Sequence, residues 1–401
     1  MKVLEAILIC LVQLISVESE LPEEMILVAE REFDAIAVNM VFGVNEAEES
    51  IYPKILVTPD KIRFMDEKGI TLSEVVIPEK SSAVFSKEGH FVGIVEYPAK
   101  AGQKQAFALQ EIKFGVFNER GKRLYQLKRA QEYEHPIPGF YISPKDGSVV
   151  LSDNPEGLLY FYDNKGELTR ELDLFEADEY NDERNIACCF SSDGNYFVVN
   201  ALKNYDTPRE EGKSYVILFD NSGTEIWRKQ LEEKISSGVE ISISGDYIVA
   251  CGYKVNDELA IESKSTFLLD KDGEVICRYS RLFRLVAFSS DGKYLALGER
   301  NRVWLVKTQT GEILWEKQFT RRVRGLDVSQ SGLVLIETAG GKYEDGTFVF
   351  YSPEVTIITL TGHEIYEKEF TDSRFYSPGI KILDGGEGFG VGFADRFLFY
   401  K

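Results

Sequence analysis

Arginines are the most unusual chemically capable residues in this sequence. A guanidinium group is planar, always charged and carries five donors in a fixed fork, so it suits carboxylates, phosphates, sulfates and aromatic rings. The chain around them is acidic, with 66 Asp and Glu against 46 Lys and Arg and a formal net charge of −20. Seven arginines in short connecting segments are therefore candidate ligand-binding residues: Arg184, Arg281, Arg284, Arg321, Arg322, Arg324 and Arg374.

Four tyrosines in longer polar segments are further candidates, because tyrosine combines a large contact area with a polar hydroxyl. The segments are residues 97–105, 201–214, 252–265 and 339–347, and the candidates are Tyr97, Tyr205, Tyr253 and Tyr343. The same segments contain acidic residues, including Asp206, Asp257 and Glu344. The alternative is therefore that the arginines pair with these carboxylates and bind no ligand.

Motifs for catalysis and metal binding are missing from the sequence. The histidines, His90, His135 and His363, lack the spacing of a metal-binding pair. There is no P-loop, no dinucleotide-binding glycine motif after a strand and no nucleophile elbow. Residues 270–274 resemble the start of a calcium loop, but the distal Glu is missing, so we interpret them as a turn. We expect no enzyme, metal or cofactor. A hydrolase or lyase with scattered catalytic residues, acting on polysaccharide or peptide, is the alternative.

A strand pattern repeats from about residue 82 to the end of the chain. Each copy has an apolar strand, a Ser/Asp/Gly turn, a second apolar strand, a variable loop, a third strand, a tight Asp/Asn-x-x-Gly turn and a last strand. Ser and Asp bond to nearby backbone amides and Gly accepts a positive φ, which favours these turns. Successive first turns lie 40 to 57 residues apart and start at Ser86, Ser143, Ser191, Ser244, Ser289, Ser329 and Asp384. This spacing brackets the roughly 40–50-residue period of propeller blades.

The copies resemble the WD40-like and quinoprotein-like (PQQ-type) propeller repeats, in which a Ser-Pro-Asp-Gly turn precedes an apolar strand and a Gly-x-x-x-Trp turn ends the blade. Residues 310–315 and 222–227 carry the likeness. True WD40 repeats would show a Gly-His early in each blade and a terminal Trp-Asp, and this recurring pattern is missing. The resemblance implies an all-β fold, a β-propeller over residues 55–401, and implies little about function because this fold serves many functions.

We expect seven four-stranded blades, with the N- and C-terminal strands joined in one closing blade. Residues 377–401 supply three strands and residues 61–77 look like a third and a fourth, so joining the ends would leave no open sheet edge. Residues 20–54 form an N-terminal strand-like segment, for which joining the closing blade is one option. Because both ends then carry a third strand, eight blades is the alternative.

Propeller topology brings the candidate residues together. The second-to-third strand loops and the blade-to-blade connections share one face, here called the loop face, and the two families of tight turns lie on the other. The seven arginines and four tyrosines are therefore expected on the loop face, where long loops on a rigid scaffold tend to carry binding residues.

The N-terminus has the pattern of an export signal. Lys2 precedes an apolar stretch at residues 6–15, and residues 17–19 offer small side chains at the cleavage positions. Residues 1–19 are thus a predicted signal peptide, either cleaved or kept as a short signal-anchor, with a buried strand as the alternative, and no other stretch approaches the length of a membrane span. Cys188 and Cys189 would face opposite sides of one strand, and the cysteines permit disulfides without requiring them.

These observations predict an exported, non-enzymatic interaction module located in the periplasm, on the cell surface or in the medium. Its partner would be a protein or an anionic or glycan ligand, bound on the loop face by a monomer or by a member of an envelope assembly. The negative net charge disfavours nucleic acid and anionic membrane surfaces.

Overall fold

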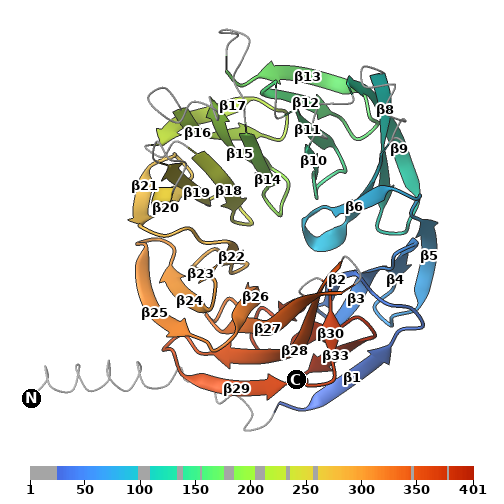
Figure 1. Ribbon diagram of the computed structural model, residues 1–401, viewed down its shortest axis with the longest axis vertical. Coiled ribbons are helices and arrows are strands. Elements are labelled where there is room, and N and C mark those ends of the chain that lie inside the picture. Colours follow the sequence, from blue (N-terminus) through green and yellow to red (C-terminus); the bar gives the residue numbers. More distant parts are fainter. Residues whose placement is uncertain are drawn as a thin grey trace, which may run out of the picture.

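The computed structural model describes residues 25–97, 109–132, 139–153, 156–175, 185–203, 213–231, 235–255, 261–344, 347–376 and 379–401. The strands form eight antiparallel sheets arranged in a ring around a central axis, which is a β-propeller (Figure 1). The predicted signal peptide, residues 1–19, lies outside the described residues. Within them, no helix is long and apolar enough to span a membrane.

The first four blades follow the chain, and each runs from an inner strand to an outer one. Blade 1 contains β2 (Asn39–Asn45), β3 (Ser50–Val57), β4 (Lys61–Met65) and β5 (Thr71–Val76). Blade 2 contains β6 (Ser81–Phe85), β7 (Phe91–Glu96), β8 (Leu109–Asn118) and β9 (Arg123–Glu132). Blade 3 contains β10 (Gly139–Ile142), β11 (Val149–Asp153), β12 (Leu158–Tyr162) and β13 (Leu168–Asp173). Blade 4 contains β14 (Asn185–Phe190), β15 (Tyr196–Lys203), β16 (Lys213–Asp220) and β17 (Glu225–Leu231).

The next three blades repeat this order, and one of them carries an additional short strand. Blade 5 contains β18 (Ile235–Ile241), β19 (Tyr247–Val255), β20 (Ile261–Asp270) and β21 (Val275–Tyr279). Blade 6 contains β22 (Leu285–Phe288), β23 (Tyr294–Glu299), β24 (Arg302–Lys307) and β25 (Glu312–Gln318). Blade 7 contains β26 (Arg322–Val328), β27 (Val334–Glu344), β28 (Thr347–Ile358) and β29 (Glu364–Glu369), and β30 (Arg374–Phe375) pairs with β28.

Blade 8 closes the ring by joining the two ends of the described chain. It contains β31 (Ile380–Ile382), β32 (Phe389–Gly392), β33 (Arg396–Tyr400) and, as its outer strand, β1 (Leu27–Glu32). Backbone bonds between Ile26 and Lys401, at 2.9 and 3.0 Å, extend the pairing of β1 with β33. The strand β1 lies inside the N-terminal segment 20–54, for which joining the closing blade was one option.

The expected propeller is confirmed, but the preferred count of seven blades is corrected to the alternative of eight. The additional blade is blade 1, whose β2–β3 turn has neither the Ser/Asp start nor the glycine of the other seven. Asn45 Oδ1 accepts the amides of Ala47 and Glu48 at 3.1 and 3.3 Å, and Glu49 takes the positive φ of 48°. An Asx turn thus replaces the repeated turn chemistry and hides this blade from a pattern based on Ser, Asp and Gly.

The core is divided among the contacts between neighbouring blades, with one apolar cluster at each of the eight junctions. Middle strands are buried on both sides, as in β24, whose residues 303–306 are all buried. Outer strands alternate instead, as in β5, because they lie at the rim. Cys188 and Cys189 face the junctions with blades 3 and 5 respectively, as predicted for adjacent strand residues.

Candidate functional site

Four arginines gather around a cavity of about 170 Å³ on the loop face, between blades 6 and 7. Three of them, Arg284, Arg322 and Arg324, belong to the predicted set, and Arg300 was not predicted. The remaining lining comes from largely non-polar positions. This arginine pocket is lined by Arg284, Leu285, Gly298, Arg300, Arg322, Val323, Arg324 and Phe350.

The backbone geometry directs the four arginine side chains toward the same cavity. The β26–β27 register shifts between Val323 and Gly325, so Arg324 is the additional residue of a β-bulge, a feature that redirects a side chain. Arg300 turns the chain between β23 and β24 with a positive φ of 55°. The Val323 amide donates to the Arg300 carbonyl at 2.7 Å, and the Arg284 amide donates to Gly298 at 3.0 Å. The first bond joins blade 7 to blade 6 across their junction, and the second holds the segment of Arg284 against β23 within blade 6.

The four guanidinium groups have no carboxylate partner among the described residues. No ion pair or side-chain hydrogen bond involves them there, and the Nε atom of Arg324 is buried without an acceptor. The pKa of Arg324 is lowered, first by burial and then by the neighbouring charge of Arg322. The pocket therefore holds positive charge that nothing in the described chain compensates, in a protein of net charge −20.

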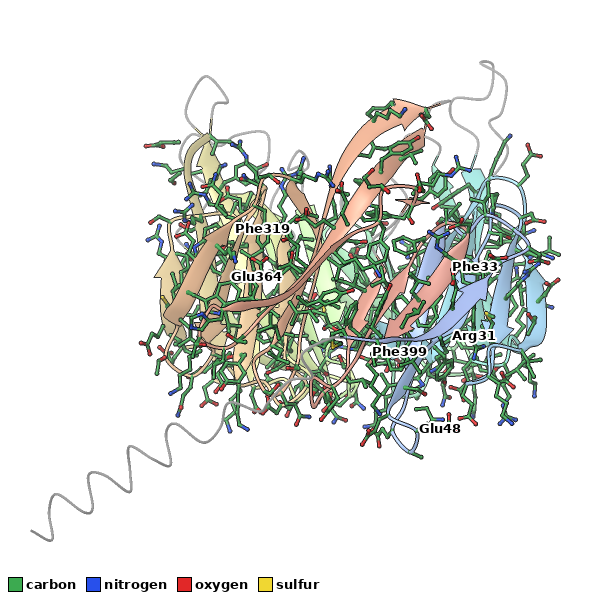
Figure 2. All side chains as sticks on the ribbon, turned by 90° about the horizontal axis from the view of Figure 1, so that it is seen from below. Arg31, Phe33, Glu48, Phe319, Glu364 and Phe399 are labelled. Carbon is green, nitrogen blue, oxygen red and sulfur yellow. The ribbon has the colours of Figure 1, made fainter. Side chains whose placement is uncertain are left out.

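An aromatic hairpin stands beside the pocket. Strands β27 and β28 extend beyond the rest of blade 7, and Figure 2 shows them rising from the ring on the side opposite the β2–β3 turn, where Glu48 is labelled. Tyr343, Phe348, Phe350 and Phe375 form a continuous series with ring centroids 4.8 to 5.1 Å apart. The guanidinium of Arg324 lies 4.4 Å from the ring centre of Phe350 and 5.7 Å from that of Phe348. At the outer end of this series, the side chain of Tyr343 is exposed to solvent, with 77% of its surface accessible.

The other predicted arginines lie outside the pocket. Arg321 donates to the Ser352 carbonyl at 2.6 Å and pairs with Glu369 at 2.5 Å. Arg281 packs over Trp304 at 4.9 Å and lies 3.7 Å from Glu299. Arg321 and Arg281 therefore match the alternative in which the arginines pair with carboxylates of the same chain. Arg374 is exposed on β30, opposite Tyr351, and Arg184 lies outside the described residues.

The three predicted tyrosines that the structure describes lie apart from one another. Tyr97 shares a 2.6 Å hydrogen bond with Ser82 and packs on the core between blades 2 and 3. Tyr253 packs against the clusters around Leu202 and Cys251. Tyr205 lies outside the described residues, so Tyr343 is the predicted tyrosine that lies near the arginine pocket.

A second cavity, of about 520 Å³, opens between blades 5 and 6. Its single carboxylate is Glu299, which lies 3.7 Å from Arg281 and 3.9 Å from Lys264. The lining residues are Lys264, Tyr279, Ser280, Arg281, Phe283, Glu299, Trp304 and Ile313. Its charges are thus already paired with one another, unlike those of the arginine pocket.

Sequence reasoning missed Arg300, Phe348 and Phe350. Arg300 lies in a short β23–β24 turn, whereas the predicted residues all come from blade-to-blade connections and long loops. The alternation of aromatic residues at 348 and 350 was a usable signal, because residues two apart on a strand share a face. Segment 339–347, expected to be a loop, is largely strand.

The cysteines of the propeller are free thiols, and potential metal ligands are the other feature of interest. Cys188, Cys189, Cys251 and Cys277 are free, and burial raises the pKa of Cys189 to about 12 and that of Cys251 to about 11. Over the described ranges, no group of three or more His, Cys, Asp or Glu side chains is placed to hold a metal ion.

Comparisons with known proteins agree with the fold. The family model of the outer membrane protein assembly factor BamB (PQQ_2) matches residues 212–356, less than half of the chain. No curated protein shows significant similarity to the sequence. BamB from Moraxella catarrhalis has a TM-score of 0.55 and 11% identity, over 94% of this chain and 100% of that one.

Two further propellers show the same level of likeness. The C-terminal WD40 domain of Sif2 has a TM-score of 0.55 and 11% identity, over 94% of this chain and 99% of that one. Sqt1 of Saccharomyces cerevisiae has a TM-score of 0.54 and 10% identity, over 93% and 98%. At these identities the likeness concerns the fold. By its repeats and its architecture, the chain is an eight-bladed β-propeller that resembles the WD40-like and PQQ-like propellers.

Proposed function

We propose that this propeller is a non-enzymatic interaction module that binds an acidic segment of a protein partner on its loop face. The observation that carries the proposal is the arginine pocket, where four guanidinium groups with no carboxylate partner among the described residues line one cavity of an acidic protein. Assembling like charges is unfavourable unless something else opposes it. A bound acidic segment would remove that cost and would gain charge-assisted hydrogen bonds.

The aromatic hairpin supports the choice of a protein partner. Exposed aromatic residues beside arginines are the combination enriched at the centre of protein interfaces. Tyr343 extends the contact area outward from the pocket, and Phe350 forms part of its wall. The partner would therefore place an acidic residue in the pocket and non-polar atoms along the hairpin.

Export is part of the proposal and rests on the signal-like pattern of residues 1–19. The similarity to BamB, whose name describes outer membrane protein assembly, favours a role in a cell-envelope assembly. Mass spectrometry of the protein purified from its own cells would test this, since an N-terminus near residue 20 is expected.

The binding test uses a fluorescently labelled oligoglutamate peptide and measures anisotropy at low ionic strength. The variant Arg284→Ala/Arg322→Ala/Arg324→Ala should bind at least about 100-fold more weakly, since hydrogen bonds to charged groups contribute roughly 1.5–3 kcal/mol each. The control Lys229→Ala/Arg302→Ala/Lys317→Ala removes three cations paired with Glu274, Glu316 and Glu364. It carries the same net charge and should bind like the native chain.

Equal weakening in both triple variants would reduce the effect to net charge and would refute the proposal. The same pair of proteins, used as bait on the cell-envelope fraction, should retain a partner on the native and control chains and lose it on the pocket variant. Turnover of a polysaccharide or peptide library by the native protein would instead favour the hydrolase or lyase alternative.

A further inference from the structure

The arginine pocket concentrates more positive charge than one carboxylate can neutralise. We propose that it binds a single tetrahedral, doubly charged oxyanion, which is the chemistry of a phosphate monoester and of free phosphate. The inference rests on the proposed function, because it names the group that a partner would place in this pocket. The four arginines are the donors, and Phe350 forms one wall.

Charge and hydrogen-bonding capacity favour this chemistry. Four guanidinium groups line the cavity, and none has a carboxylate partner among the described residues. A carboxylate carries one charge on two oxygens, enough for one or two forked arginine contacts. A phosphoryl group carries about 1.5 to 2 charges and three strongly accepting oxygens. It can therefore engage arginines that approach from several directions.

The arginines approach the cavity from three separate stretches of backbone. Arg284 precedes β22, Arg300 lies in the β23–β24 turn, and Arg322 and Arg324 lie on β26. Such convergence suits a tetrahedral group, whose oxygens point in different directions. A planar carboxylate would leave some of the guanidinium groups without an acceptor.

Main-chain hydrogen bonds and aromatic rings hold the arginine pocket in shape, so the arginine N–H donors are not needed for this. Backbone bonds join the Val323 amide to Arg300 and the Arg284 amide to Gly298, so the supporting segments are braced by main-chain atoms. The guanidinium of Arg324 lies over the rings of Phe350 and Phe348, a cation–π contact that occupies none of its N–H donors. The buried Nε atom of Arg324 has no acceptor among the described residues, so this donor is not occupied by a protein group there.

The size of the pocket points to one functional group. Its volume of about 170 Å³ is below the roughly 300–1,000 Å³ of sites that enclose a whole small molecule. Its other walls are Leu285, Gly298, Val323 and Phe350, whose side chains provide no hydrogen-bond acceptor. A neutral glycan needs both donors and acceptors, whereas an oxyanion needs donors alone.

The first experiment measures inorganic phosphate binding to the whole protein by titration calorimetry and thermal unfolding, with acetate at equal ionic strength for comparison. Phosphate should bind with one site per chain and raise the melting temperature, as a ligand selective for the folded state does. Acetate should bind at least about 10-fold more weakly. Arg322→Ala/Arg324→Ala should weaken phosphate binding about 100-fold or more, and Arg302→Ala/Lys317→Ala should leave it unchanged.

A conservative variant separates geometry from charge. Arg324→Lys keeps the positive charge but loses the planar fork and its stacking on Phe350, so phosphate affinity should fall to an intermediate value. Phosphate binding that is equal in the native chain and in Arg322→Ala/Arg324→Ala, with both proteins folded by circular dichroism, would overturn the inference.

The second experiment distinguishes this inference from the proposed function. It compares a glutamate-rich peptide with the same peptide carrying one phosphoserine. Arginine-dependent binding at least about 10-fold tighter for the phosphopeptide supports the inference and identifies an ester as the source. Equal, arginine-dependent binding of both peptides overturns the inference and leaves the proposed function standing. Binding of free phosphate alone supports the inference with the free anion as ligand and counts against the proposed function.

Discussion

Among single residues, neighbouring arginines on the loop face differ in whether a carboxylate is within reach. Arg321 is held by Glu369 and by the Ser352 carbonyl, whereas Arg322, next in the chain, lines the arginine pocket. Arg321 precedes β26 whereas Arg322 is the first residue of that strand, and the two adjacent arginines therefore have different surroundings. The composition of a basic segment therefore says little about which member is free to bind.

A buried glutamate in β27 gives a prediction about pH. Glu337 has no exposed surface, neither carboxyl oxygen has a partner among the described residues, and burial raises its pKa to about 8. Because the folded pKa exceeds the unfolded value near 4.5, the neutral form stabilises the fold fully below pH 4.5. That stability is lost as pH rises toward 8, at up to about 1.4 kcal/mol per pH unit.

Glu337→Gln should therefore flatten the pH dependence of the unfolding free energy between about pH 5 and 8, measured in urea at several pH values. Glu344→Gln in the same strand is the control, because the Glu344 carboxyl bonds to Lys342 and has a lowered pKa. It should leave the slope in this window unchanged. An unaltered slope in Glu337→Gln would show that this carboxyl is ionised in the folded protein.

Among the elements, two have roles that reach beyond their own blade. The long β27–β28 hairpin carries the aromatic series that borders the arginine pocket. Strand β1 covers the edge of β33 and so completes the blade formed by the C-terminal strands. An uncovered edge strand is a site for pairing with other chains.

Removal of residues 1–34 should destabilise the protein by several kcal/mol and promote aggregation, since each lost backbone hydrogen bond costs ~1 kcal/mol and Phe33 leaves the cluster between blades 8 and 1. Thermal unfolding and light scattering would measure both effects. Removal of residues 1–24 keeps β1 and serves as the control, with no change expected. A chain without residues 1–34 that melts like this control would show that closure does not depend on β1.

In the molecule as a whole, one turn connects blades that are not neighbours in the ring. The β6–β7 turn of blade 2, which includes the 3-10 helix η1 (Lys87–Gly89), projects toward the middle of the ring (Figure 1). Lys87 pairs with Glu240 and donates to the Ile241 carbonyl at 3.1 Å, both in blade 5. Blades 2 and 5 are not neighbours, so this contact ties distant parts of the ring together on the tight-turn face.

A double-mutant cycle with Lys87→Met and Glu240→Gln should give a coupling energy of roughly 1–3 kcal/mol in denaturant unfolding. The two side chains are only 27% and 31% exposed, so solvent screens their attraction less than at the surface. The surface pair Arg302–Glu316 is the comparison, with a coupling below about 1 kcal/mol. Equal coupling energies would mean that the Lys87–Glu240 pair stabilises the fold no more than a surface ion pair does.

The sequence by itself determined the propeller, the turn chemistry of seven blades and the face on which Arg284, Arg322 and Arg324 lie. These are local properties, since strand alternation and Ser/Asp/Gly turns depend on residues close in the chain. The tertiary structure decided the eighth blade, because Asn45 and Glu49 make an equivalent turn with different residues. It also decided which arginines form a pocket, since only packing of blade 7 on blade 6 brings Arg284 and Arg300 beside Arg322 and Arg324. Arginines that meet only through the packing of two blades leave no pattern in any short stretch of the sequence.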